Sequence, residues 1–145
     1  MATSREKVLK AAAEKDKYPL PEDYEAIGWV TEPNCGDKLA IAFNTSREVI
    51  TQIGYSLSDS ACPPMFACAS VLCEMALNKP VVAAYVIKSA AISEALGTDG
   101  GLDEQSVHCA MMAELALKRA IVDFSKRRSE ELAAITPKSA HQLSE

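Results

Sequence analysis

Residues 39–55 read LAIAFNTSREVITQIGY, and the pattern of this stretch decides the fold. Large apolar residues recur at every second position from Leu39 to Phe43, and the same period of two returns from Val49 to Tyr55 after a polar loop at 44–48. Alternation with this period is typical of β-strands, because successive side chains point to opposite faces. Just upstream, Ile27–Val30 is a third short strand candidate. The sequence therefore predicts a three-stranded antiparallel meander.

Helices are expected before and after the meander in the sequence. The segments expected to form helices are rich in Ala, Leu, Met, Glu and Lys, and their interiors contain no proline or glycine. Only the segment after Pro80 is ambiguous, since VVAAYVI could also be a buried strand, and the proline favours a helix that starts at Val81. The last segment has an apolar stripe and a Glu114–Lys118 pair at i, i+4, so it is expected to lie on the sheet. The expected helices are Ser4–Lys15, Met65–Leu77 with a start near Cys62, a helix from Val81, Ala90–Leu96 and His108–Lys126.

Length and composition indicate one ordinary globular domain. With 145 residues the chain can bury a single core, which we place in residues 1–128, before a polar tail at 129–145. A formal net charge of -5 argues against binding to nucleic-acid phosphates. The uncharged block Val81–Ile87 is too short to span a membrane, and the first residues lack a secretory segment. We therefore expect a cytoplasmic protein with no membrane or nucleic-acid partner.

Three of the five cysteines lie at expected boundaries between elements. A reducing cytoplasm does not favour a disulfide framework, so metal or sulfur chemistry is the better interpretation. Cys35 lies in a turn, while Cys62 and Cys109 lie at expected helix starts, where backbone N–H groups favour a thiolate. His108 and Asp37 could add a nitrogen and an oxygen donor. Together these five residues form a candidate metal site with mixed sulfur, nitrogen and oxygen donors.

Each of these residues could also have a purely structural role. Cysteine is among the most buried residue types, and Cys68 and Cys73, inside the helix after Cys62, are expected to be packing residues of the core. The cysteine spacing contains no CxxC pair. The sequence also contains no glycine-rich nucleotide-binding motif, no GxSxG motif of serine hydrolases and no HExxH motif of zinc proteases. His108 and Cys109 are neighbours on a helix and so point apart, which disfavours a nucleophile–base pair. Residue types and spacing alone leave both simple packing and ligation open.

Three segments in order resemble the NifU-like (IscU-type) iron-sulfur cluster scaffold family. The likeness covers roughly Ser4 to Arg128 and includes the strand before the first cysteine. The segments are Asn34-Cys35-Gly36-Asp37, then Cys62 through Ala69-Ser70 to Glu74, and then His108-Cys109 with Ala113-Glu114, Ala116, Lys118, Ala120-Ile121 and Asp123. They match that family's CGD, central cysteine and HC motifs.

The resemblance implies a compact α+β domain with three antiparallel strands and helices packed on one face. It implies a scaffold, not an enzyme, that holds a [2Fe-2S] cluster through Cys35, Cys62 and Cys109, with His108 or Asp37 completing the coordination. Asp37 would keep the cluster labile, and Cys109 would accept persulfide sulfur from a cysteine desulfurase. Acceptor proteins would then receive the cluster. The isolated protein could hold Zn(II) on the same residues.

The sequence also departs from the family. Gly100–Val107 replaces the proline-rich segment that an Hsp70-type chaperone recognises, which argues against chaperone-assisted release. Ala61 replaces a glycine, and Pro63-Pro64 replace small residues, which could stiffen the loop that carries Cys62. Two alternatives remain: a zinc-dependent sulfur-transfer protein of the SufU type, and an interaction domain without a cluster. His108 argues against the first alternative, and the intact ligand set argues against the second.

Overall fold

The computed structural model describes residues 4–13, 17–33, 36–58, 61, 63–96 and 104–135. Three strands form one sheet in the order β1-β2-β3, and both neighbouring pairs are antiparallel. This confirms the predicted meander. In chain order the elements are α1 (Ser4–Ala13), β1 (Ala26–Thr31), β2 (Lys38–Ser46), β3 (Val49–Leu57), α2 (Pro63–Ala76), α3 (Val81–Tyr85), α4 (Ser89–Leu96) and α5 (Glu104–Ile135).

The turn between β2 and β3 is tighter than the polar loop expected at 44–48. Only Arg47 and Glu48 separate the strands, with φ angles of 52° and 65°. Two successive residues at positive φ give a turn whose twist matches the strands that it joins. A register shift at Asn44/Thr45 accommodates the polar end of β2, so the strand continues as far as Ser46.

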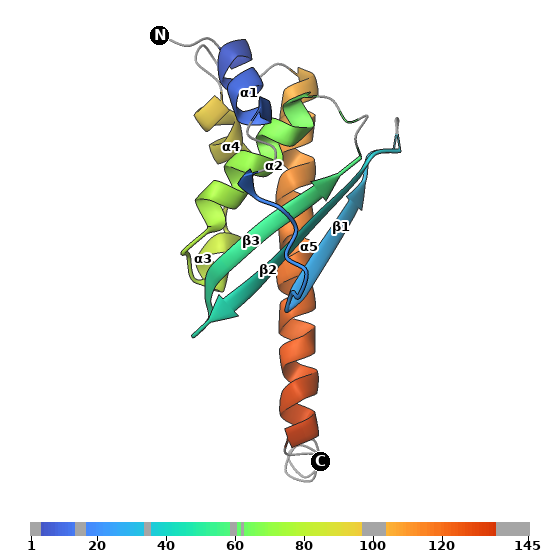
Figure 1. Cartoon of the computed structure of the whole chain (residues 1–145), viewed down its shortest axis with the longest axis vertical. Coiled ribbons are helices and arrows are strands. Elements are labelled where there is room, and N and C mark those ends of the chain that lie inside the picture. The colour runs from blue at the N-terminus through green and yellow to red at the C-terminus, as the bar shows by residue number, and fades with distance from the viewer. Residues whose placement is uncertain are drawn as a thin grey trace.

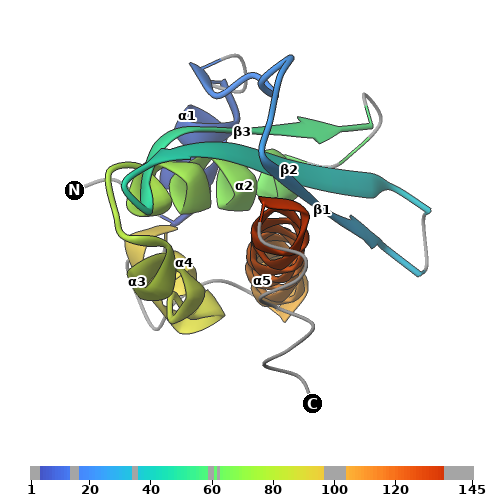
Figure 2. The same ribbon diagram turned by 90° about the horizontal axis from the view of Figure 1, so that it is seen from below.

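One face of the sheet is apolar and covered by helices. Leu39, Ile41 and Phe43 pair with Leu57, Tyr55 and Ile53, and paired residues project from the same face. Figure 2 shows α2 and α5 lying along this sheet, with α3 and α4 beyond them. Helices α2, α3, α4 and α5 therefore lie on one face of the sheet, as the family resemblance implied.

Helix α5 lies unusually close to β1. A Cβ atom added to Gly28 would come within 2.3 Å of the Ala116 carbonyl oxygen and the Ala120 nitrogen, so only glycine allows this approach. Two side chains of α5 then hold the strand's backbone: Arg119 Nη1 donates to the Trp29 carbonyl oxygen at 2.8 Å, and the Ile27 N–H donates to Asp123 at 3.0 Å. These contacts fix α5 in position against β1, and Figure 1 shows the helix passing behind the sheet.

Helix α5 is longer at both ends than the predicted His108–Lys126. It begins at Glu104, so the second half of the Gly100–Val107 segment is helical, whereas residues 100–103 lie outside the described residues. It ends at Ile135, so residues 129–135 of the expected tail are also helical. The ion pairs Arg127–Asp123, at 3.0 Å, and Arg128–Glu48, at 3.2 Å, support the helix where it passes its predicted end at Lys126. Residues 136–145 lie outside the described residues, and a domain boundary at 128 stays a prediction.

Two shorter predictions are confirmed. The ambiguous segment after Pro80 is helical, as α3. A helix also begins directly after residue 62, since α2 starts at Pro63. Among the described residues, no helix combines the length and the apolar character needed to cross a membrane.

Candidate functional site

Two chain connections and the start of α5 lie at one edge of the sheet, where β1 and β3 end and β2 begins. Strand β1 ends where β2 begins, with Thr31 opposite Lys38, and β3 ends opposite the start of β2, with Leu57 paired to Leu39. In Figure 1 the β1 and β3 arrows point toward the end of the molecule at which α5 begins. The connections at this edge are the segments in which the sequence places Cys35 and Cys62.

The connection between β1 and β2 is a tight turn closed by its own backbone. The Glu32 N–H donates to the Asp37 carbonyl oxygen, and the Gly36 N–H donates to the Glu32 carbonyl oxygen, each at 2.8 Å. Gly36 has φ +75°, a conformation that glycine adopts without a steric penalty. Cys35 itself lies outside the described residues. The turn brings the buried Asp37, which is 8% exposed, to the start of β2.

The connection between β3 and α2 is tied to this turn. The Lys38 N–H donates to Ser58 Oγ at 3.2 Å, directly after Asp37. The Ala61 N–H then donates to the Ser58 carbonyl oxygen at 2.9 Å. Cys62 lies outside the described residues, between Ala61 and the first residue of α2. The described neighbours of Cys62 are therefore held beside the strand that follows Asp37.

Helix α5 brings His108 to the same turn. His108 Nε2 lies 3.4 Å from Glu32 Oε1, an ion-pair distance when the imidazole is protonated. The His108 side chain is 49% exposed, whereas Cys109 is only 4% exposed. Their opposite exposure agrees with the expectation that these neighbours point apart, and it does not favour a nucleophile–base pair.

One argument from the sequence about Cys109 was wrong. Because α5 begins at Glu104, Cys109 lies in the second turn of the helix and not at its start. The unpaired N–H groups of a helix belong to its first turn, so they do not act directly on this thiol. Any activation of Cys109 must come from other groups or from a bound metal.

Glu32 is a residue of the candidate site that the sequence analysis did not single out. It carries a carboxylate, yet its side chain is only 10% exposed. A signal was present, because the buried positions of β1 alternate through Ala26, Gly28 and Val30, and the next inward position is Glu32. An ionisable residue at an inward position is unusual and marks a functional or paired group.

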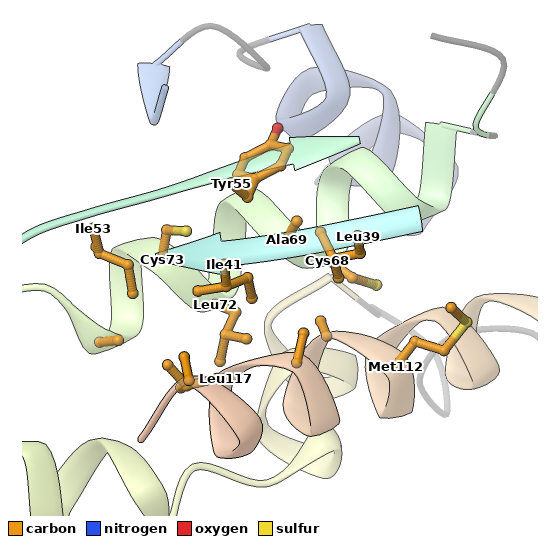
Figure 3. Close-up of a cluster of buried hydrophobic side chains, with 14 of the residues drawn as sticks. Leu39, Ile41, Ile53, Tyr55, Cys68, Ala69, Leu72, Cys73, Met112 and Leu117 are labelled. Atoms are coloured by element: carbon orange, nitrogen blue, oxygen red, sulfur yellow. The ribbon is translucent and has the colours of Figure 1, made fainter. Parts of the chain in front are cut away.

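Cys68 and Cys73 are core residues, as predicted. Both are fully buried in α2, and Figure 3 shows them among apolar side chains between the sheet and α5. Burial strongly raises the pKa of the Cys73 thiol, because the thiolate would lose its hydration. Cys73 therefore stays protonated and is a poor ligand or nucleophile.

The structure thus places three of the five predicted site residues. Asp37 and His108 belong to segments that the Glu32 contact joins, and Cys109 follows His108 on α5. Within the described ranges, no group of three or more His, Cys, Asp or Glu side chains is arranged to hold a metal ion. The full ligand set with Cys35 and Cys62 stays a prediction. The thiol, imidazole and carboxylate groups are of the types that bind zinc and iron.

The fold defines a class of small α+β domains with helices on one face of a three-stranded antiparallel sheet. A solved structure described as a putative iron-sulfur cluster assembly scaffold protein for the SUF system, from Fervidobacterium islandicum, has a TM-score of 0.66 over 80% of this chain and 94% of that one, at 15% identity. A NifU-like N-terminal protein from Brucella abortus has a TM-score of 0.62 over 83% and 92%, at 14% identity. At such low identity these likenesses show the fold alone.

The chain belongs to the NifU-like N-terminal domain family, whose model matches residues 5–131. A relative named iron-sulfur cluster assembly scaffold protein IscU 1, from Archaeoglobus fulgidus, is 35% identical over 75% of this chain and 68% of its own length. The protein named iron-sulfur cluster assembly scaffold protein IscU from Escherichia coli is 30% identical over 70% of this chain and 75% of its own length. The match confirms the family that the sequence motifs indicated.

Proposed function

We propose that this chain is a scaffold on which an iron-sulfur cluster is assembled and from which the cluster is passed to another protein. One observation carries the proposal. The chain belongs to the NifU-like family, and two contacts join three of its segments at one edge of the sheet. The Glu32–His108 contact joins the turn before Asp37 to the start of α5, and the Lys38–Ser58 contact joins that turn to the connection after β3. The relatives named above as scaffold proteins support the same function.

The cluster is the cargo of this site, and the side chains of the chain are its ligands. Cys35, Cys62 and Cys109 provide thiolates, the usual ligands of iron-sulfur clusters. His108 or Asp37 completes the coordination of a [2Fe-2S] cluster. In the isolated protein the same residues can hold Zn(II), which accepts sulfur, nitrogen and oxygen donors in a tetrahedron. The chain performs no turnover of its own and acts as a carrier.

Sulfur reaches the site through Cys109. Its thiolate attacks the terminal sulfur of a persulfide on a cysteine desulfurase, the sulfur–sulfur bond of the donor breaks, and the donor cysteine leaves as a thiolate. This step moves one sulfur atom without net oxidation. Reduction of that sulfur to bridging sulfide then takes two electrons, from iron(II) or an added dithiol. Cys109 is 4% exposed, so the surrounding chain must open before the donor can reach it.

Asp37 is the residue that makes the cluster transferable. A carboxylate oxygen is a harder ligand than a thiolate and suits iron in a cluster less well. Asp37 lies at the base of the turn, at the edge where Ser58 and Lys38 meet. Acceptor proteins would therefore compete for an iron that is held less tightly. All these thiols must stay reduced, so we place this function in the cytoplasm.

Anaerobic reconstitution tests the proposal. Wild type, incubated with iron(II), cysteine, a desulfurase and dithiothreitol, should develop the visible absorption and Mössbauer spectrum of a [2Fe-2S] cluster. Cys35→Ala, Cys62→Ala and Cys109→Ala should each abolish or strongly reduce the cluster. Cys68→Ala, in the core, is the matched control and should keep it. If wild type forms no cluster while it retains zinc and accepts sulfur, it is a zinc-dependent sulfur-transfer protein and the proposal fails.

A further inference from the structure

We propose that Glu32 is a positioning residue that orients the His108 imidazole toward the metal or cluster. The inference rests on the proposed function, because it assigns His108 a role as ligand. Glu32 Oε1 lies 3.4 Å from His108 Nε2, and the two side chains differ in exposure, 10% for Glu32 against 49% for His108. A largely buried carboxylate therefore faces a half-exposed imidazole at the edge where the site is expected.

The backbone of Glu32 is fixed by the turn. Its N–H donates to the Asp37 carbonyl oxygen, and its own carbonyl oxygen accepts from the Gly36 N–H. Both polar groups of this peptide backbone are therefore engaged within the turn that carries Cys35 and Asp37. The Glu32 side chain therefore extends from a backbone that the turn holds in place.

The element that carries His108 is fixed against the same strand. Gly28 allows α5 to approach β1 closely, and Arg119 and Asp123 bind the strand's backbone at Trp29 and Ile27. The distance between the end of β1 and His108 is thus set by packing. The packing of α5 on β1 therefore brings the Glu32 carboxylate and the His108 imidazole together.

The geometry assigns different tasks to the two imidazole nitrogens. Nε2 faces Glu32, so the carboxylate favours the tautomer in which Nε2 carries the proton. The lone pair of Nδ1 is then available for a metal. Metal-bound histidines commonly donate their other N–H to a carboxylate, which fixes both the tautomer and the ring orientation. Without Glu32, a side chain as exposed as His108 would rotate among several rotamers.

Cobalt(II) binding to the whole metal-free chain tests this role, because thiolate-bound Co(II) absorbs in the visible region. Glu32→Ala should weaken Co(II) binding roughly 10–100-fold, the usual effect of removing such a partner. Glu32→Gln keeps an oxygen that can accept a hydrogen bond and should bind with intermediate affinity. Glu94→Ala, an exposed glutamate of α4, is the matched control and should bind as wild type does. Circular dichroism checks that each variant is folded.

A double-mutant cycle separates positioning from direct ligation. If Glu32 acts through His108, Glu32→Ala should cause no further loss in the His108→Ala background. The same loss in both backgrounds would overturn the inference, because Glu32 would then act as a ligand or through another residue. Unchanged affinity of Glu32→Ala in the wild-type background would overturn it as well.

Nitrogen-15 NMR of the metal-free protein reports the tautomer of His108 without requiring a bound metal or cluster. The chain has two histidines, and His108→Ala identifies the signal of His108. The wild-type imidazole should be the Nε2–H tautomer, and Glu32→Ala should give a mixture of tautomers. An identical spectrum in the variant would contradict the proposed role. Reconstitution of the wild type reports on the scaffold function separately, so a failed cluster and a failed role of Glu32 are distinct results.

Discussion

Individual side chains at the sheet edge differ sharply in their access to solvent. His108 is half exposed, while Asp37 and Cys109 are buried, so the proposed site would present a nitrogen donor outward and keep its carboxylate and thiol within the protein. A buried carboxylate is maintained only where it has partners or a ligand. This arrangement suits a site that binds its cargo from solvent and then encloses part of it.

Replacing Asp37 by alanine should slow the loss of the cluster. In the proposed site the Asp37 carboxylate competes with His108 for the fourth position, and without it the His108 imidazole, which suits iron better, would hold that iron alone. The measurement is the decay of visible absorption after a chelator or an acceptor protein is added. Asp23→Ala, in the loop before β1, should decay as wild type does. An unchanged lifetime for Asp37→Ala would show that Asp37 does not control release.

Replacing Cys73 by serine should destabilise the fold without preventing cluster assembly. The hydroxyl would be buried at a fully enclosed position, and such a polar group costs about 1–3 kcal/mol when it lacks a good partner. Urea unfolding measures the change in the free energy of unfolding, and reconstitution below the unfolding midpoint measures the cluster. Cys68→Ser should also keep the cluster. A folded variant of either cysteine that forms no cluster would show that a core thiol is a ligand.

At the scale of elements, the contact between α5 and β1 positions the site. The strand leads directly into the turn at Glu32, and the helix carries His108 and Cys109. A displacement of one element against the other would separate the two halves of the site. The glycine that permits their close approach is therefore as important to the proposed site as the proposed ligands are.

Gly28→Ala should be far more harmful than Gly36→Ala. The new Cβ at Gly28 would meet backbone atoms of α5 at 2.3 Å, which should cost about 3 kcal/mol or more and weaken Co(II) binding. At Gly36 a Cβ meets no atom within 4 Å, so the cost is the left-handed conformation, about 1–2 kcal/mol. Gly36→Asn should cost less than Gly36→Ala. Equal losses of unfolding free energy at both glycines would contradict the close packing of α5 on β1.

Glu114 should give a pH-dependent contribution to stability. It joins α5 to the start of α4 by accepting from the Ser89 N–H at 2.5 Å, and it pairs with Lys118 at 3.0 Å. Burial alone would raise the pKa of Glu114, but the hydrogen bonds from Ser89 and Lys118 and the charges of Lys118 and Lys88 lower it overall. Because the folded pKa lies below the unfolded value of about 4.3, the stabilisation is present above that pH and is lost as the pH falls through the folded pKa.

Glu114→Gln should therefore lower the free energy of unfolding by about 1 kcal/mol at pH 7. At pH 3 the difference from wild type should be smaller, since the wild-type carboxylate is then increasingly protonated. Urea unfolding at both pH values checks this expectation. A difference that is the same at both pH values would exclude the ionised carboxylate as its cause. Glu74→Gln, an exposed glutamate of α2, is a suitable control.

At the scale of the whole molecule, local patterns in the sequence predicted most of the architecture. Hydrophobic patterns in a sequence directly reflect which residues are buried. Such patterns predicted the strands β2 and β3, the apolar stripe of α5 and the core positions of Cys68 and Cys73. The Glu32–His108 contact joins segments far apart in the chain and leaves no local trace except an acidic residue at an inward position. The extension of α5 beyond Lys126 begins with ion pairs of Arg127 and Arg128, which hydrophobic periodicity does not register.

The proposed scaffold function requires that the whole chain both build a cluster and give it away. The most direct measurement mixes the anaerobically reconstituted protein with an apo-ferredoxin and follows circular dichroism in the visible region, where the two bound clusters differ. We predict that the spectrum of a [2Fe-2S] cluster on this chain appears first and is then replaced by that of holo-ferredoxin, faster for wild type than for Asp37→Ala. A protein that never acquires the cluster and keeps a bound zinc ion, or one that acquires the cluster and never releases it, would contradict the account.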